Sequence, residues 1–190
     1  MAKGCDWGYG KIPGHVLVDA GMSFVCRYLS HSPGKNLTGE ELLNLKASGL
    51  DVVLVWETTE RRCTEGRQAG IDDATTALQM AKALSDDAST IYFACDYDFS
   101  EDDLEGGISD YFKGLRSVLA LHQIGVYGGY KTVKFILDQG LAGYAWQTYA
   151  WSHGQWDDRA QIRQTNIYGP TLAGVSCDTD ESMQSDFGQF

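Results

Sequence analysis

The chain has 190 residues, 43% apolar and 22% charged, which is the balance of one folded domain of ordinary globular size. Its 26 acidic and 15 basic residues give a formal net charge of −11, which disfavours nucleic acid and anionic membrane surfaces as partners. No apolar run approaches the roughly 18–20 residues that a membrane span needs. The five cysteines are scattered and form no C-x-x-C pair, so neither a zinc site nor a disulfide framework is predicted.

Short apolar segments alternate with helical patterns along the chain. Their aromatic and β-branched content, without clean alternation, is typical of strands buried on both faces, as in a parallel sheet. The predicted strands are residues 4–7, 23–29, 51–56, 90–95, 124–127, 144–149, 160–165 and 174–178.

The segments between these strands carry helix signals. Thr38 and Glu41 predict a capping box, in which the Thr38 hydroxyl accepts from the amide of residue 41 and the Glu41 carboxylate reaches back. Gly49 is predicted to end that helix in the left-handed conformation. Apolar stripes predict two further helices, around residues 74–84 and 104–122, the second including His122.

Alternation of strands and helices leaves an open doubly wound sheet or a closed barrel as the architecture. The glycine fingerprint of a dinucleotide fold is missing, because the sequence from Gly8 to Gly10 lacks a third glycine. Eight units in this chain average about 24 residues each, below the roughly 250-residue norm of a (β/α)₈ barrel. We therefore predict a single α/β domain over residues 1–190, a compact TIM-like barrel whose helices are incomplete or missing toward the C-terminus.

Acidic residues stand at the predicted ends of several strands. They are Asp6, Glu57, Asp96, Asp98, Asp178 and Asp180. In a barrel, the carboxyl ends of the strands form one rim, where catalytic groups project. Like charges held close together raise one another's pKa, which keeps a carboxylic acid protonated near neutral pH.

Aromatic and amide side chains accompany these acids and suggest a saccharide ligand. They are Trp7, Trp56, Tyr97, Tyr127, Trp146, Gln147, Tyr149 and Gln164. Rings can stack on the C–H face of a pyranose while amides and carboxylates bind its hydroxyls. Two alternatives remain open: Trp56 and Trp146 could be core residues, and the two Asp-x-Asp pairs could bind Mg²⁺ or Ca²⁺.

An ordered set of motifs resembles a known family. The set includes the segments around Asp6, 24–29, 55–57, 91–98 and 125–128. The chain resembles the glycoside-hydrolase-like domain called domain of unknown function 1906, which occurs in actinobacterial proteins and phage lysins and is related to the family 25 muramidases. The resemblance implies a compact barrel with an acidic pocket, and cleavage of the β-1,4 bond after N-acetylmuramic acid.

The same resemblance carries over residue by residue. Asp6 matches the Asp of the first strand, Asp96 the Asp of an Asp-x-Glu pair on the fourth, and Asp178 the Asp near the last. Asp98 stands where the muramidases have the Glu that donates a proton, so this chain departs from the family pattern at that position.

Spacing bears on the mechanism. Asp96 and Asp98, two apart on a strand, would share a face with Cβ atoms about 7 Å apart, which does not match the 5–5.5 Å of a double-displacement pair. An N-acetylated sugar can instead supply its own acetamido oxygen as the nucleophile. We therefore hypothesise Asp98 or Glu57 as the acid, Asp96 as the carboxylate that orients the amide, and Asp6 and Asp178 as pocket charges.

These inferences predict a peptidoglycan-active glycosidase of the endolysin or lysozyme type, from a phage lysin or an actinobacterial wall protein. We expect an antimicrobial monomer that degrades the cell wall by acting on its glycan strand, without cofactor or metal. Because the first residues lack an apolar h-region, no secretory signal is predicted, and a lysin would accumulate in the host cytoplasm before it reaches the wall.

Two other functions stay open at this point. One is a non-catalytic barrel that binds wall glycan, which the missing Glu at position 98 favours. The other is a metal-dependent hydrolase that uses Asp96, Asp98 and Asp178.

Overall fold

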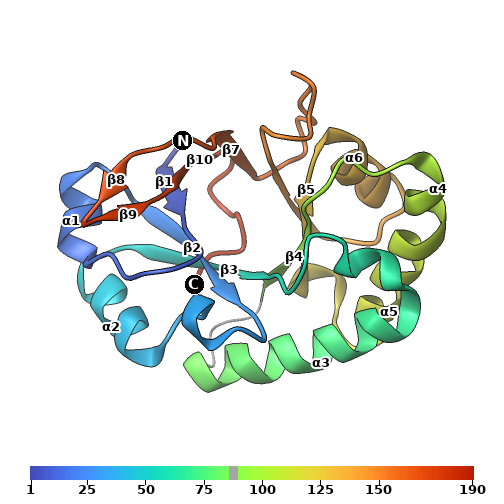
Figure 1. Cartoon of the computed structure of the whole chain (residues 1–190), viewed down its shortest axis with the longest axis horizontal. Helices are drawn as coiled ribbons and strands as arrows, with labels where there is room; N and C mark the ends of the chain where they lie inside the picture. The colour runs from blue at the N-terminus through green and yellow to red at the C-terminus, as the bar shows by residue number, and fades with distance from the viewer. Residues whose placement is uncertain (86–89) are drawn as a thin grey trace.

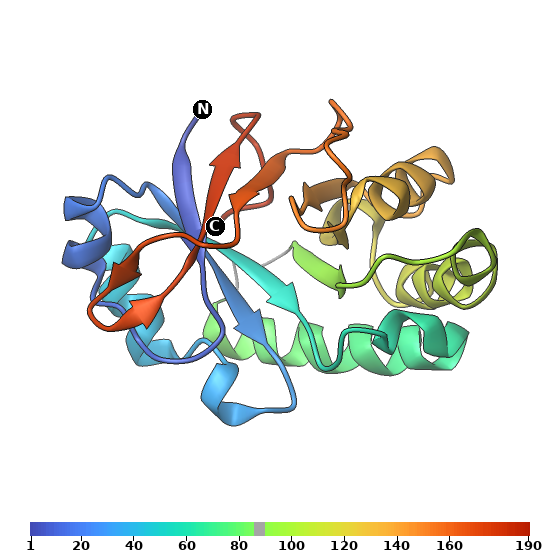
Figure 2. The same cartoon turned by 45° about the horizontal axis from the view of Figure 1, so that its top comes forward.

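A closed eight-stranded barrel forms the centre of the molecule, as predicted, in a computed structural model that describes residues 1–85 and 90–190 (Figure 1). The strands follow the order β1-β10-β7-β6-β5-β4-β3-β2 around the barrel. Figure 1 and Figure 2 together show them surrounding one axis. Their bounds are β1 Lys3–Asp6, β2 Phe24–Leu29, β3 Asp51–Trp56, β4 Ile91–Cys95, β5 Ile124–Gly128, β6 Tyr144–Gln147, β7 Ile162–Asn166 and β10 Asp178–Ser182.

The direction of the last strand differs from the prediction. Neighbouring strands from β1 to β7 are parallel, whereas β10 is antiparallel to both β7 and β1. The predicted strand 174–178 corresponds to the shorter strand β9 (Val175–Ser176). Its predicted place in the barrel is wrong, because β9 pairs with β8 (Thr171–Leu172) outside the barrel. Since β10 is reversed, its first residue Asp178 lies opposite Asp6, the last residue of β1.

Helices cover the barrel on the outside and become sparse toward the C-terminus, as expected (Figure 1). They are α1 Gly14–Asp19, α2 Gly39–Ala47, α3 Gly66–Leu84, α4 Glu101–Asp103, the π-helical turn η3 Leu104–Ile108, α5 Ser109–Arg116 and α6 Tyr130–Asp138, with short 3-10 turns η1 Pro33–Lys35, η2 Arg62–Glu65 and η4 Leu121–Gln123. His122 lies exposed in η4, so its predicted place on an apolar helix stripe is wrong. Within the described residues, no helix is both long and apolar enough to cross a membrane.

The start of α2 shows how a barrel contact overrides a local signal. Thr38 Oγ1 accepts a hydrogen bond from the amide of Glu41 at 3.2 Å, as predicted. The Glu41 carboxylate does not complete the capping box, because it accepts from Arg27 Nε at 2.7 Å and both side chains are buried. Leaving the buried Arg27 guanidinium without a counterion costs more free energy than leaving the helix end without a second cap. Gly49 ends the segment at φ +80°, as predicted.

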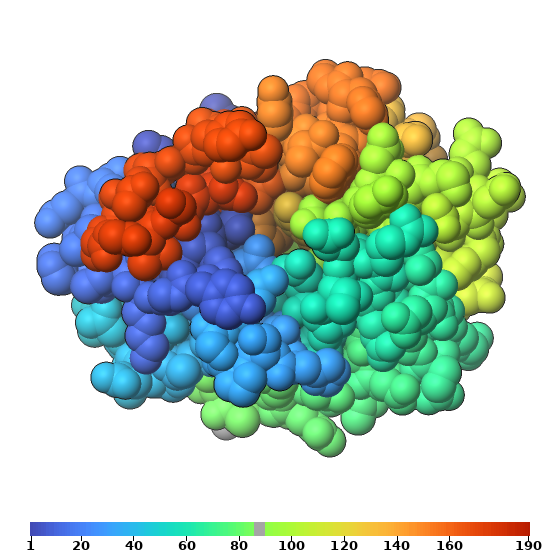
Figure 3. Space-filling view, in the orientation of Figure 1, coloured from blue at the N-terminus to red at the C-terminus, as the bar shows by residue number. Residues whose placement is uncertain are grey.

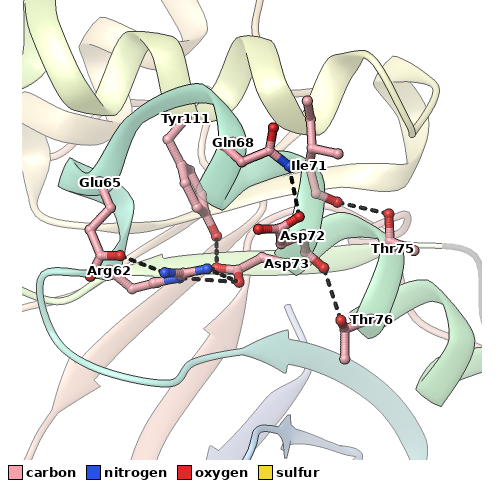
Figure 4. Close-up of polar contacts among 9 residues, drawn as sticks. All are labelled: Arg62, Glu65, Gln68, Ile71, Asp72, Asp73, Thr75, Thr76 and Tyr111. Carbon is pink, nitrogen blue, oxygen red and sulfur yellow. Dashed lines mark hydrogen bonds and ion pairs between the residues drawn. The ribbon is translucent and has the colours of Figure 1, made fainter.

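Helices α3 and α5 pack closely because of two glycines. A Cβ at Gly70 would lie 2.1 Å from the carbonyl oxygen of Tyr111, and one at Gly114 would lie 2.2 Å from that of Arg67. Beside this contact, buried Asp73 of α3 binds Arg62 of η2 and Tyr111 of α5 (Figure 4). This cluster anchors the segment that follows β3 to the outer layer of the barrel.

Strand alternation divides the core into two layers. Phe24, Val53, Tyr92 and Trp146 belong to the cluster inside the barrel, together with Phe187 from the C-terminal segment. Val25, Leu54, Trp56 and Phe93, at the alternate positions, belong to the cluster between the barrel and its helices. The inward positions near the carboxyl ends of the strands continue this alternation, and they are polar.

Candidate active site

The rim at the carboxyl ends of the parallel strands is lined by polar side chains from all eight barrel strands or from the residue that follows them. In chain order these are Asp6, Tyr28, Glu57, Asp96, Tyr127, Thr148, Gln164 and Asp178. The space-filling view shows this end of the molecule hollowed between the segments that follow β1, β2, β3 and β6 (Figure 3). The strand ends therefore bring side chains that are distant in sequence to one mouth.

Gln164 of β7 connects the acids. Its Nε2 donates to Asp6 Oδ2 at 2.9 Å and to Asp178 Oδ2 at 3.3 Å. Its Oε1 accepts from Thr148 Oγ1 at 2.5 Å and from Tyr127 OH at 3.3 Å. These two donors fix the orientation of the amide, so its N–H groups point to the carboxyls of Asp6 and Asp178.

Asp6 and Asp180 form a buried carboxyl pair beneath the rim. Trp146 Nε1 donates to Asp180 Oδ1 at 2.9 Å, and Tyr28 OH donates to Asp6 Oδ1 at 3.3 Å. Burial, and then the negative charge of Asp6, raise the pKa of Asp180 well above its ordinary value. Burial also raises the pKa of Asp6 to about 6, against the opposing effect of the donors from Gln164, Asp180 and Tyr28.

Asp178 is the acid that is half-buried at the mouth. Burial, and then the negative charges of Asp6 and Asp96, raise its pKa to about 7. In the part of the chain that the structure describes, no Lys, Arg or His forms an ion pair with Asp6, Asp96, Asp178 or Asp180. Asp178 can therefore both hold and release a proton near neutral pH.

Asp98 does not join this group. Because β4 ends at Cys95, Asp98 no longer shares a strand face with Asp96. Its Oδ2 lies 2.8 Å from His153 Nε2 and its Oδ1 lies 3.4 Å from Lys131 Nζ. The hydrogen bond from His153 lowers its pKa. The predicted role of Asp98 as the proton donor has no support in this arrangement, because its carboxylate contacts His153 and Lys131 and its pKa is lowered.

Glu57 reaches the rim but is already paired. Its Oε2 lies 2.6 Å from Lys35 Nζ, and the ammonium group of Lys35 sits 4.3 Å from the centre of the Tyr28 ring. Glu57 thus brings the ammonium group of Lys35 beside the mouth. Because the Glu57 carboxylate is already engaged by the Lys35 ammonium group, Asp178 is the better candidate for the acid.

Several predicted sugar-binding residues are buried in other contacts. Trp7 and Trp56 belong to the layer between barrel and helices, where Arg27 stacks on Trp7. Trp146 fills the barrel interior beneath the rim, and Gln147 binds Ser152, the carbonyl of Gln155 and the amide of Asp157. These four expose no face to a ligand, so their predicted contact with sugar is wrong.

Other aromatic side chains remain available at the rim. Tyr97 is 41% exposed and Tyr149 is 55% exposed. Tyr127 is nearly buried and contributes its hydroxyl to the network around Gln164. The sequence prediction missed Tyr28 and Thr148 and left Asp180 out of the site. Counting by twos from Phe24 along β2 would find Tyr28, and counting from Trp146 of β6 would find Thr148.

The metal alternative has no ligand set in this arrangement. Among residues 1–85 and 90–190, no three His, Cys, Asp or Glu side chains are grouped so that they could hold a metal ion. Asp98 lies against His153 and Lys131 rather than beside Asp96 and Asp178.

The barrel is shared with lysozyme-type hydrolases. Solved structures with this fold include a family 25 glycosyl hydrolase from Bacillus anthracis, 12% identical with a TM-score of 0.61 over 98% of this chain and 90% of that one. A muramidase from Trichobolus zukalii is 15% identical, with a TM-score of 0.62 over 97% of this chain and 95% of that one. At these identities the likeness defines the class of fold, a compact barrel of the muramidase type.

Within that class, residues 15–182 match the family described as "Rv2525c-like, glycoside hydrolase-like domain", and the chain belongs to this family. "Putative peptidoglycan hydrolase Rv2525c" from Mycobacterium tuberculosis is 26% identical over 97% of this chain and 82% of its own length. The crystal structure of that Tat-secreted protein with L-tartrate has a TM-score of 0.94 at 25% identity, covering 99% of this chain and 98% of that one. The predicted resemblance is confirmed.

Proposed function

We propose that this protein hydrolyses a glycosidic bond in the glycan strand of bacterial peptidoglycan, as a muramidase-like enzyme whose active site is the acidic barrel mouth. The name of its mycobacterial relative supports the substrate class. The observation that carries the proposal is that Gln164 Nε2 binds both Asp6 and Asp178. Within residues 1–85 and 90–190, neither of these two carboxyl groups forms an ion pair. Perturbed acids gathered in a hollow are typical of a catalytic site.

The geometry favours Asp178 as the acid and Asp96 as the orienting carboxylate. In the proposed reaction, the acetamido oxygen of the substrate attacks the anomeric carbon while Asp178 protonates the departing glycosidic oxygen. The Asp96 carboxylate accepts a hydrogen bond from the acetamido N–H and balances the positive charge that develops there. The ionised Asp178 then takes a proton from water, which opens the oxazolinium ring and restores both residues.

Asp6 and Asp180 have a supporting role in this scheme. The protonated Asp180 donates to Asp6, which favours the negative charge on Asp6. That charge, acting with burial, keeps a proton on Asp178 up to about pH 7.

Site variants test the proposal on purified peptidoglycan. We expect Asp178→Asn and Asp96→Asn each to lower the release of new reducing ends by roughly 10²–10⁴-fold, since each removes a group that acts in the transition state. Mass spectrometry of the released muropeptides identifies the cleaved bond. Asp102→Asn, an exposed acid of α4, serves as the matched control. Full activity in both site variants would exclude the assignment.

A glycan-binding barrel without hydrolysis is the second candidate. It is favoured because Asp98 replaces the expected Glu and is held by His153 and Lys131, away from the mouth. In that case the protein would sediment with peptidoglycan, yet no new reducing ends would appear. Both functions place the protein at the cell wall, and its relative Rv2525c is described as Tat-secreted.

A further inference from the structure

The segment that follows β6 lies across the end of β4. It contacts the three residues that follow β4, which are Asp96, Tyr97 and Asp98. Trp151 Nε1 donates to Asp96 Oδ1 at 2.9 Å. The Trp151 ring packs on Tyr97, with centroids 6.1 Å apart and planes at 35°. His153 Nε2 then meets Asp98 Oδ2 at 2.8 Å. Two short pieces of chain, 55 residues apart in sequence, are thus aligned side by side.

The base of this segment is firmly held. The buried Ser152 hydroxyl accepts from the amide of Tyr130 at 3.1 Å and from Gln147 Nε2 at 2.8 Å, and it donates to the carbonyl of Thr148 at 2.5 Å. The segment also passes so close to Gly129 that a Cβ there would lie 2.4 Å from the carbonyl oxygen of Trp151. These contacts determine where the segment crosses the rim.

The outer end of the segment depends on Asp98. His153 has φ +48°, in the left-handed region that residues other than glycine rarely adopt, so its conformation needs support from a specific contact. Asp98 supplies that contact, and its other oxygen lies 3.4 Å from Lys131 Nζ. Asp98, His153 and Lys131 are the titratable groups that meet at this point.

We propose that Asp98 and His153 form a clasp that holds the Trp151 indole against Asp96, and that all three are positioning residues for the Asp96 carboxylate. The indole engages one Asp96 oxygen, so it restricts rotation of the carboxylate. This role rests on the proposed function, in which Asp96 must present its other oxygen to the substrate amide. The clasp also accounts for Asp at position 98, where muramidases have Glu, since the Asp98 side chain contacts His153 and Lys131 of the protein itself.

Variants of the clasp test this inference in the full chain. Because a positioning error of about 1 Å can cost 10²-fold, we expect Trp151→Phe to lower kcat by roughly 100-fold with KM little changed. Asp98→Ala and His153→Ala should each lower kcat by roughly 10- to 100-fold, and the double variant should be no worse than either single variant. Asp102→Ala, the matched exposed control, should leave kcat unchanged.

Hydrogen exchange provides a measurement that does not depend on hydrolysis. The amides of residues 149–156 should lose protection in Asp98→Ala and His153→Ala, and keep it in Asp102→Ala. Unchanged protection in the two clasp variants would overturn the clasp, whether or not the protein cleaves peptidoglycan. Loss of activity in Asp98→Ala but not in His153→Ala would also overturn it, because Asp98 would then act on the substrate itself.

Discussion

Asp73 and Asp178 are both withdrawn from bulk water, but their surroundings differ. Asp73 accepts from Arg62 Nε at 3.1 Å, from Arg62 Nη2 at 2.9 Å and from Tyr111 OH at 2.8 Å (Figure 4). Asp178 accepts one amide hydrogen at 3.3 Å, and the charges of Asp6 and Asp96 act on it. One carboxylate has a cation and a hydroxyl as partners, whereas the other has acids as neighbours.

The difference separates a structural acid from a functional one. A buried carboxylate with its cation holds η2, α3 and α5 together, and removing one partner leaves the other uncompensated. A carboxyl group among other carboxylates makes the folded state less stable when it ionises. The same repulsion raises its pKa, so its proton is available near neutral pH at the expense of stability. Removal of the Asp73 carboxylate and removal of the Asp178 carboxylate should therefore change stability in opposite directions.

The largest stability effect should come from Asp73→Ala. Loss of this carboxylate leaves the Arg62 guanidinium and the Tyr111 hydroxyl without their partner, so we expect the free energy of unfolding to fall by about 3 kcal/mol. Urea denaturation at pH 7 measures the change. Thr75→Ala, on an exposed face of the same helix, is the control and should stay within about 0.5 kcal/mol of wild type. A similar small change in Asp73→Ala would show that the cluster is not structural.

Asp178→Asn should act in the opposite direction and depend on pH. The pKa of Asp178 is about 7 in the folded protein, above the ordinary value of 3.8, so its ionisation destabilises the fold as pH rises toward and through 7. Asparagine cannot ionise, and we expect it to add about 1–3 kcal/mol of stability at pH 8 and almost none at pH 4. Thermal denaturation at the two pH values tests this. A variant that is destabilised equally at both would contradict the pKa assignment.

Tyr28→Phe should have a smaller effect at the same site. The Tyr28 hydroxyl donates to Asp6 and lowers its pKa, so its removal should raise the Asp6 pKa above about 6. We expect a loss of about 0.5–1 kcal/mol in stability at pH 8, where Asp6 is ionised. Carboxyl NMR titration reports the Asp6 midpoint directly, with Tyr149→Phe at an exposed position as the control. An unmoved midpoint would remove Tyr28 from the network.

Glu65→Ala should change stability least. Glu65 pairs with Arg62 beside Asp73, but its side chain is 56% exposed and the pair spans three residues of one turn. Exposed pairs of this kind contribute about 0.5 kcal/mol or less. Urea denaturation alongside Asp73→Ala compares an exposed and a buried partner of the same guanidinium. Equal losses would mean that burial does not decide the strength of these ion pairs.

Simple rules predicted where some acids of the candidate site lie. Asp6 and Asp96 follow buried strands, and the carboxyl ends of parallel strands meet at one rim. Asp178 lies at that rim for a different reason, because it begins an antiparallel strand. Trp7 and Trp56 are each adjacent in sequence to an inward acid, so alternation places them on the outer face, which the aromatic argument overlooked.

Local sequence was sufficient for the seven parallel strands, the capped start of α2 and the left-handed Gly49, because periodicity and capping act over a few residues. Contacts over long separations needed the closed structure. Reversal of β10 brings Asp178 opposite Asp6, β7 brings Gln164 between them, and β6 sends Trp151 and His153 across to Asp96 and Asp98. Such partners depend on how the barrel closes, and no pattern within a short segment encodes that closure.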